Sequence, residues 1–156
     1  MTRRPERPQR RFPDAPDFIG RYVREAFMFL MAEVNDGIGA HYPDVTPAQT
    51  RIMSLLDRNG TRVGELAERA QLTKQSLSEL VVGLEALGLV ERRPDPSDGR
   101  AKLVVPTEEG LRAMAIGFDV AQAVHRRWAR VLGQDDMAEL MRLLGRLVAE
   151  LGEPPP

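Results

Sequence analysis

The side chains best suited to recognising another molecule lie between residues 73 and 79 of this 156-residue chain. Short hydroxyls, an amide, a lysine and a glutamate follow one another there, and each can hydrogen-bond a base edge or a phosphate in a DNA major groove. Further charges surround a turn, where an arginine suits a narrow minor groove. The candidate DNA-binding residues are Thr73, Lys74, Gln75, Ser76, Ser78, Glu79, Arg92, Asp98, Arg100 and Lys102.

Two helices and a hairpin must position these side chains. Apolar residues from Val63 to Ala70 recur at helical spacing, and a second apolar-periodic segment follows a short break. The second helix is expected to begin at Thr73, whose hydroxyl can cap it, and to end at Gly88. Residues 89–93 and 101–105 then read as strands around a turn rich in proline, aspartate and glycine. This order predicts a winged helix-turn-helix with a two-strand wing.

Longer helices are predicted on both sides of this module. A capping box at Thr46 and Gln49, with Pro47 between them, starts the preceding helix. The fold class we expect is mainly α with a small β-hairpin wing and long terminal dimerisation helices. The expected organisation is a disordered basic tail (1–16), a dimerisation helix and loop (17–45), a DNA-binding domain (46–106), C-terminal dimerisation helices (107–151) and a tail (152–156).

The terminal helices carry broader apolar stripes than one chain can cover. An isologous dimer would bury them, whereas a monomer with a helical cap is the alternative. The predicted dimer-interface residues are Phe18, Ile19, Tyr22, Leu140, Leu144, Leu147 and Leu151.

Composition excludes several other functions. The chain has no cysteine, which excludes disulfides and thiol switches, and with two histidines no metal site or other cofactor is expected. Phosphate-binding glycine loops and clustered nucleophiles are missing from the sequence, so we predict no enzyme. No apolar run approaches the ~18 residues of a membrane helix, and a cytoplasmic protein is expected.

Charge does not by itself predict a nucleic-acid binder. The net charge is −1, and residues 61–106 hold seven cations and seven acids, so affinity must depend on where charges lie. Residues 1–12 carry five arginines against one glutamate; they form either a solvated leader or an arm that touches phosphate.

Individual roles also stay open. Gln75 could read adenine or bond phosphate, and Glu79 could accept from cytosine or orient an arginine. The alternative function is a winged-helix protein-interaction module without specific DNA binding. Steep salt dependence would favour DNA, because phosphate contacts release counterions.

The motifs resemble those of the MarR family of transcriptional regulators. The similarity lies in Leu-Ala-Glu at 66–68, Thr-Lys-Gln-Ser-Leu-Ser at 73–78, Gly-Leu-Val-Glu-Arg at 88–92, Asp-x-Arg at 98–100 and Thr-x-x-Gly at 107–110. The resemblance implies a homodimer that binds a pseudo-palindromic operator in double-stranded DNA, usually as a repressor. It also implies that Asp98 pairs with an arginine to hold the wing. Gly99 departs from the family's common arginine, and Arg62 from its usual serine or threonine cap.

The same resemblance implies modulation by a small aromatic effector, bound where the dimer helices meet the winged module. The candidates to supply rings and a polar handle are Tyr22, Phe29, His41, Tyr42, Arg51 and Trp128, although each such residue is more often simply core or loop.

Overall fold

The computed structural model describes residues 18–152, and only the burial of Gly99 is not described within this range. The predicted basic tail at residues 1–16 lies outside this range. The described elements are α1 (Ile19–Gly39), α2 (Pro47–Ser54), β1 (Thr61–Arg62), α3 (Val63–Ala70), α4 (Lys74–Ala86), β2 (Val90–Asp95), β3 (Asp98–Pro106), α5 (Glu108–Leu132) and α6 (Gln134–Leu151).

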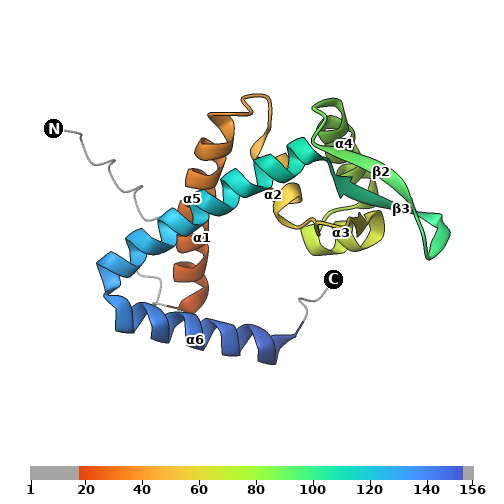
Figure 1. Cartoon of the computed structure of the whole chain (residues 1–156). Coiled ribbons are helices and arrows are strands. Elements are labelled where there is room, and N and C mark those ends of the chain that lie inside the picture. The colour runs from red at the N-terminus through yellow and green to blue at the C-terminus, as the bar shows by residue number, and fades with distance from the viewer. Residues whose placement is uncertain (1–17, 153–156) are drawn as a thin grey trace.

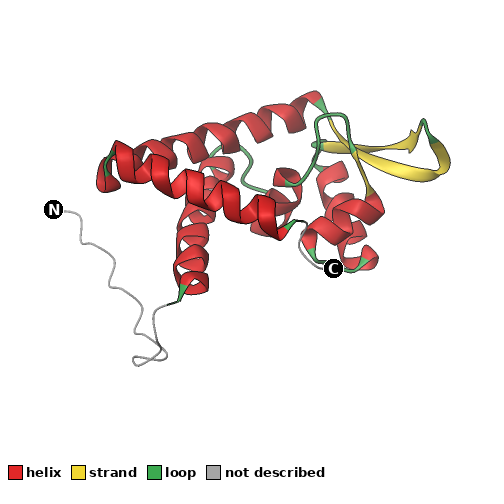
Figure 2. Ribbon diagram, turned by 90° about the horizontal axis from the view of Figure 1, so that it is seen from below, coloured by secondary structure: helices red, strands yellow, loops and turns green. Residues whose placement is uncertain are grey.

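One hydrophobic core joins α2, α3, α4 and the sheet, while the β2–β3 hairpin projects past the helices (Figures 1 and 2). Leu66 of α3, Leu77 of α4 and Val104 of β3 are fully buried in it. Ala113 adds the first turns of α5 to the same core. The recognition module is therefore packed as one unit, and its orientation is fixed relative to the start of α5.

The predicted starts of α2 and α4 and the glycine stop after α4 are confirmed, whereas α2 ends at Ser54, before the predicted Asn59-Gly60 turn. Thr46 and Gln49 form the capping box of α2, and the Thr73 hydroxyl accepts from the Ser76 N–H at 3.1 Å at the start of α4. After α4, Gly88 adopts a left-handed conformation with φ of 71°. The Leu89 N–H then donates to the Leu84 carbonyl at 3.0 Å, which closes a Schellman motif.

The predicted two-strand wing is confirmed as the β2–β3 hairpin, and a third strand that was not predicted, β1, joins its sheet. The sheet is antiparallel in the order β1-β3-β2, with Thr61 opposite Val104 and Arg92 also opposite Val104 on the other side. A two-residue strand has no measurable periodicity, so β1 could not be read from the sequence. The turn is also shorter than predicted, because β2 extends to Asp95 and β3 begins at Asp98.

The end of the wing is locked to the start of α5. The Thr107 hydroxyl donates to the Gly88 carbonyl at 2.7 Å and accepts from the Gly110 N–H at 3.0 Å. A Cβ at Gly110 would lie 1.9 Å from the Leu89 carbonyl oxygen, so only glycine fits. The Thr-x-x-Gly motif thus has a structural meaning: it lets a helix begin directly against the loop that precedes β2.

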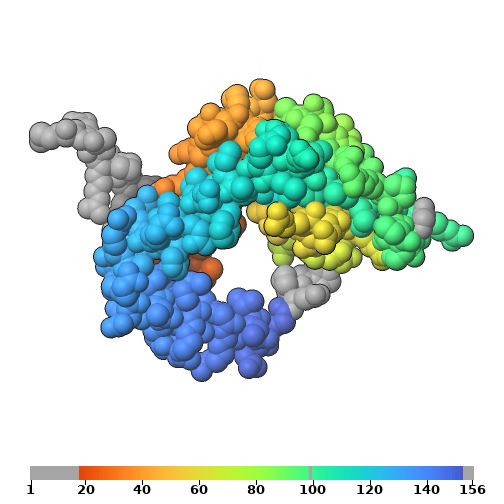
Figure 3. All heavy atoms as spheres, in the orientation of Figure 1, coloured from red at the N-terminus to blue at the C-terminus, as the bar shows by residue number. Residues whose placement is uncertain are grey.

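The long helices form the other part of the molecule. α1 crosses α5, where a Cβ on Gly37 would meet Val120 Cγ2 at 2.6 Å, and Arg127 of α5 pairs with Glu33 of α1. α6 turns back from the far end of α5, and an open space separates it from the winged module (Figure 3). Met137 is the one buried residue of α6. Within residues 18–152, no helix has the length and apolar character needed to cross a membrane.

Candidate nucleic-acid interface

The exposed face of α4 presents the predicted recognition side chains. Leu77, Val81 and Leu84 point into the core, so the opposite face of the helix is turned outward. Gln75 and Glu79 are exposed there, and with Ser78 and Val82 they line a shallow depression on the helix surface. The prediction did not include Val82, whose side chain is 53% exposed.

Two other predicted residues of this face already have partners within the helix. Thr73 Oγ1 donates to Ser76 Oγ at 2.9 Å in addition to capping the helix start. Both hydroxyls remain exposed, so each keeps lone pairs that could accept further hydrogen bonds.

Arg92 ties the recognition helix to the wing. Its guanidinium lies 3.1 Å from a Glu85 carboxylate oxygen and donates to the Ser78 hydroxyl at 3.2 Å and the Ser78 carbonyl at 3.3 Å. Its side chain is 29% exposed. A guanidinium held by Glu85 and Ser78 fixes β2 against α4, which favours a positioning role over the predicted direct contact with DNA.

The carboxylate that pairs with an arginine in the wing is that of Asp95, and not that of the predicted Asp98. Arg62 Nε donates to Asp95 Oδ2 at 2.6 Å, and the Ser97 N–H and hydroxyl both donate to Asp95 Oδ1 at 2.8 Å. The pKa of Asp95 is lowered to about 2. The hydrogen bonds from Ser97 contribute most to this shift, and the one from Arg62 comes next. Asp98, which was expected to pair with an arginine, instead accepts from the Arg100 N–H at 3.0 Å.

This arrangement also explains Arg62, the departure from a serine or threonine cap. Arg62 is the N-cap residue of α3 but makes no side-chain cap there. Its side chain reaches the wing instead, where it also donates to the Ser97 hydroxyl at 3.0 Å. The base of the recognition module and the tip of the wing are therefore linked by one charged side chain.

Pairing leaves an uneven distribution of charge. Arg62, Arg69, Arg92 and Arg93 all form ion pairs with carboxylates of the winged module or its α2–β1 loop. In the described parts of α4 and the wing, no ion pair is formed by three exposed cations: Lys74, Arg100 and Lys102. These lie at the start of α4 and on β3, where their charges remain available for phosphates.

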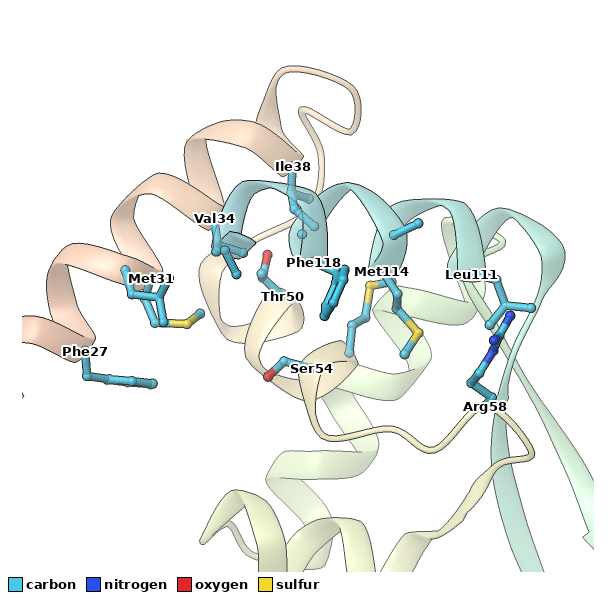
Figure 4. A pocket seen from close by; sticks show the side chains of 15 residues that line it. Phe27, Met31, Val34, Ile38, Thr50, Ser54, Arg58, Leu111, Met114 and Phe118 are labelled. Carbon is cyan, nitrogen blue, oxygen red and sulfur yellow. The ribbon is translucent and has the colours of Figure 1, made fainter. Parts of the chain in front are cut away.

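A separate pocket of about 740 Å³ lies between α1, α2 and α5 (Figure 4). Rings, aliphatic chains and thioethers cover most of its wall, including Phe27, Met31, Met114 and Phe118. Among the described lining residues, Arg58 alone is charged, and it lies beside Leu111 at the opposite end from Phe27. Two hydroxyls are contributed by α2, from Thr50 and Ser54.

The six predicted effector residues do not line this pocket. Tyr22 and Phe29 lie exposed on α1, and Trp128 is half-buried on α5. His41 Nδ1 lies 3.2 Å from the Gly37 carbonyl, and Arg51 donates to the Ala70 carbonyl at 3.0 Å, where it closes the end of α3.

The remaining candidate, Tyr42, is part of a contact between the loop after α1 and the start of α5. Its hydroxyl donates to Glu109, which is also paired with Arg112. That hydrogen bond to Glu109 raises the pKa of Tyr42, while Arg112 and then Tyr42 lower the pKa of Glu109. The sequence prediction relied on aromatic and charged residues. The pocket is lined chiefly by aliphatic and methionine side chains, which cannot be distinguished from core residues in a sequence.

Known proteins share this sequence pattern and this geometry. The model of the MarR family matches residues 44–101. Transcriptional regulator HosA of Escherichia coli O111:H- is 30% identical over 107 residues, which cover 68% of this chain and 79% of HosA. This chain belongs to the MarR family. It is a MarR-type transcriptional regulator with a winged helix-turn-helix.

Solved structures agree with this assignment. A probable transcriptional regulator from Pseudomonas aeruginosa is 28% identical to this MarR-family chain, with a TM-score of 0.63 over 85% of this chain and 98% of the other. The transcriptional repressor CouR, bound to a 23-mer DNA duplex, is 24% identical with a TM-score of 0.64, over 83% of this chain and 92% of CouR. The second similarity bears on the fold alone.

Proposed function

We propose that this MarR-family regulator represses transcription as a homodimer that binds a pseudo-palindromic operator. The observation that carries the proposal is the outward polar face of α4 beside three exposed cations without ion pairs, Lys74, Arg100 and Lys102. On this basis, α4 enters a major groove and the β2–β3 hairpin lies along the flanking backbone or minor groove. The fold's likeness to CouR, a repressor whose structure holds DNA, supports this mode of binding.

Uncovered apolar surface supports the dimer. Phe18, Ile19, Leu147 and Leu151 are between 41% and 72% exposed, and α6 contacts little besides α5. Such a surface on two terminal helices is larger than monomeric proteins usually expose. An isologous dimer would bury it and would place two copies of α4 for half-sites about 10 base pairs apart.

The pocket of Figure 4 is the place where we propose an effector binds. Its volume suits a small molecule, and its wall would favour an apolar body with one acidic group directed at Arg58. The pocket touches α1, which carries part of the proposed dimer surface, and α5, whose start is joined to the winged module. An effector that binds one spacing of the two α4 helices in a dimer better than another would shift the affinity for DNA.

Selection of duplexes from a randomised pool tests the DNA-binding proposal and does not require that the operator be identified first. We predict a two-fold symmetric consensus, bound by two chains per duplex, with an affinity that falls steeply as salt rises. Equal, weak binding to the selected and scrambled duplexes would contradict the proposal and would favour the protein-interaction module instead.

The effector proposal has its own test. Binding of a fluorescent arylalkanoic acid, and its effect on operator affinity, would be compared between wild type and Arg58→Gln. The variant should bind the acid more weakly while retaining its affinity for the operator. An acid that binds both proteins equally would contradict the assigned role of Arg58.

A further inference from the structure

Val82 is an apolar side chain at the end of a depression on α4 that is otherwise lined by polar side chains. It follows Gln75, Ser78 and Glu79 at spacings of seven, four and three residues, so the four side chains share one helix face. This face lies opposite Leu77, Val81 and Leu84, which fill the core. Val82 is 53% exposed and does not belong to the hydrophobic core of the winged module.

Valine is not the side chain that helix formation favours at this exposed position. A β-branched residue loses side-chain freedom in a helix and is less favourable there than alanine. The other side chains that line the same depression, Gln75, Ser78 and Glu79, are all hydrogen-bonding groups. The position contributes two exposed methyl groups to a surface that would otherwise recognise its partner through hydrogen bonds.

We propose that Val82 reads the 5-methyl group of a thymine in each half-site. This inference rests on the proposed function, in which the same face of α4 enters the major groove. The major groove offers one apolar group among the four bases, the thymine methyl, and apolar side chains contact it there. Gln75 and Glu79 supply hydrogen bonds to neighbouring base edges, and Val82 adds discrimination that hydrogen bonds cannot make.

Replacing thymine by deoxyuridine in the selected operator tests this contact directly, because it removes the methyl group and keeps the hydrogen-bonding edge. Each thymine would be replaced in turn, and affinity measured for wild type and Val82→Ala. With wild type, replacing the contacted thymine of a single half-site should weaken binding about three- to fivefold, the effect of removing one buried methyl group. With Val82→Ala, whose side chain is shorter, the same replacement should have a clearly smaller effect. Thymines elsewhere serve as internal controls.

Val82→Thr is the matched variant, since it keeps the branched shape and exchanges one methyl for a hydroxyl. It should lose part of the preference for thymine over deoxyuridine. Both variants should fold like wild type, because alanine favours the helix and the site is exposed.

The outcomes separate this inference from the function beneath it. The protein could bind its operator selectively while every deoxyuridine replacement has the same effect on wild type and on Val82→Ala. That result would contradict the thymine contact and leave the proposed DNA-binding function intact. If no duplex is bound selectively, the proposed function fails and the inference fails with it.

Discussion

Replacing Gly110 by alanine should separate α5 from the winged module. The new Cβ would lie 1.9 Å from the Leu89 carbonyl oxygen and 3.0 Å from its carbonyl carbon, whereas ordinary contact begins at 3.4 Å. The start of α5 must therefore move by about 1.5 Å relative to the loop before β2. Both atoms that block the Cβ belong to the backbone, so no change of side-chain rotamer relieves the clash.

The size of the effect follows from the contacts that hold this junction. Overpacking in a close-packed interior costs about 1–3 kcal/mol. The hydrogen bonds from the Thr107 N–H to the Leu89 carbonyl (3.0 Å) and from the Thr107 hydroxyl to the Gly88 carbonyl (2.7 Å) would lengthen, at about 1 kcal/mol each. Alanine's higher helix propensity returns at most ~1 kcal/mol. We expect the free energy of unfolding to fall by about 2–4 kcal/mol.

Urea denaturation at one fixed protein concentration measures this change, because a dimer's stability depends on concentration. Gly64→Ala in the first turn of α3 is the matched control: its Cβ would approach only Lys74 Cε, at 4.0 Å. The control should be unchanged or slightly more stable. If Gly110→Ala and Gly64→Ala unfold at the same urea concentration, the close approach to Leu89 does not hold the junction.

Three further predictions concern the winged module. Arg92→Gln should weaken operator binding but leave the slope of log affinity against log salt unchanged, since Glu85 already neutralises the guanidinium; a shallower slope would mean that Arg92 contacts phosphate. Arg100→Ala should weaken operator binding by roughly 1–3 kcal/mol, and wild-type affinity in a titration would refute its role. Asp95 has a folded-state pKa below that of an unfolded aspartate, so its contribution to stability is present above about pH 4 and is lost as pH falls toward about 2. Acid titration followed by circular dichroism should show a smaller loss of stability over this window in Asp95→Asn, and identical profiles would contradict the role assigned to Asp95.

Local rules were sufficient to predict most of the fold. Capping residues such as Thr46 and Thr73, and the left-handed Gly88, act within a few residues of the chain, so their effects can be read from the sequence. The two-residue strand β1 depends on pairing with β3, a partner about 40 residues away, and it could not be predicted from local pattern.

The candidate site was harder to predict where side chains have long-range partners. The surface of α4 follows from helical periodicity alone, because the buried face fixes the exposed one. The roles of Arg62, Asp95 and Arg92 depend on contacts with residues up to 35 positions away, which spacing does not reveal. Apolar pocket residues such as Met114 are indistinguishable in sequence from core residues, because the same composition serves both.

The most direct test of DNA binding by α4 and the wing is the salt dependence of operator affinity after Lys74, Arg100 and Lys102 are neutralised. Fluorescence anisotropy would compare wild type with Lys74→Gln/Arg100→Gln/Lys102→Gln over a salt series. Arg93→Gln, which removes an already paired cation of the same wing, is the control. We predict that the slope falls by about 0.9 for each phosphate that the triple variant no longer neutralises and is unchanged in the control. An unchanged slope in the triple variant would contradict the claim that this surface holds duplex DNA.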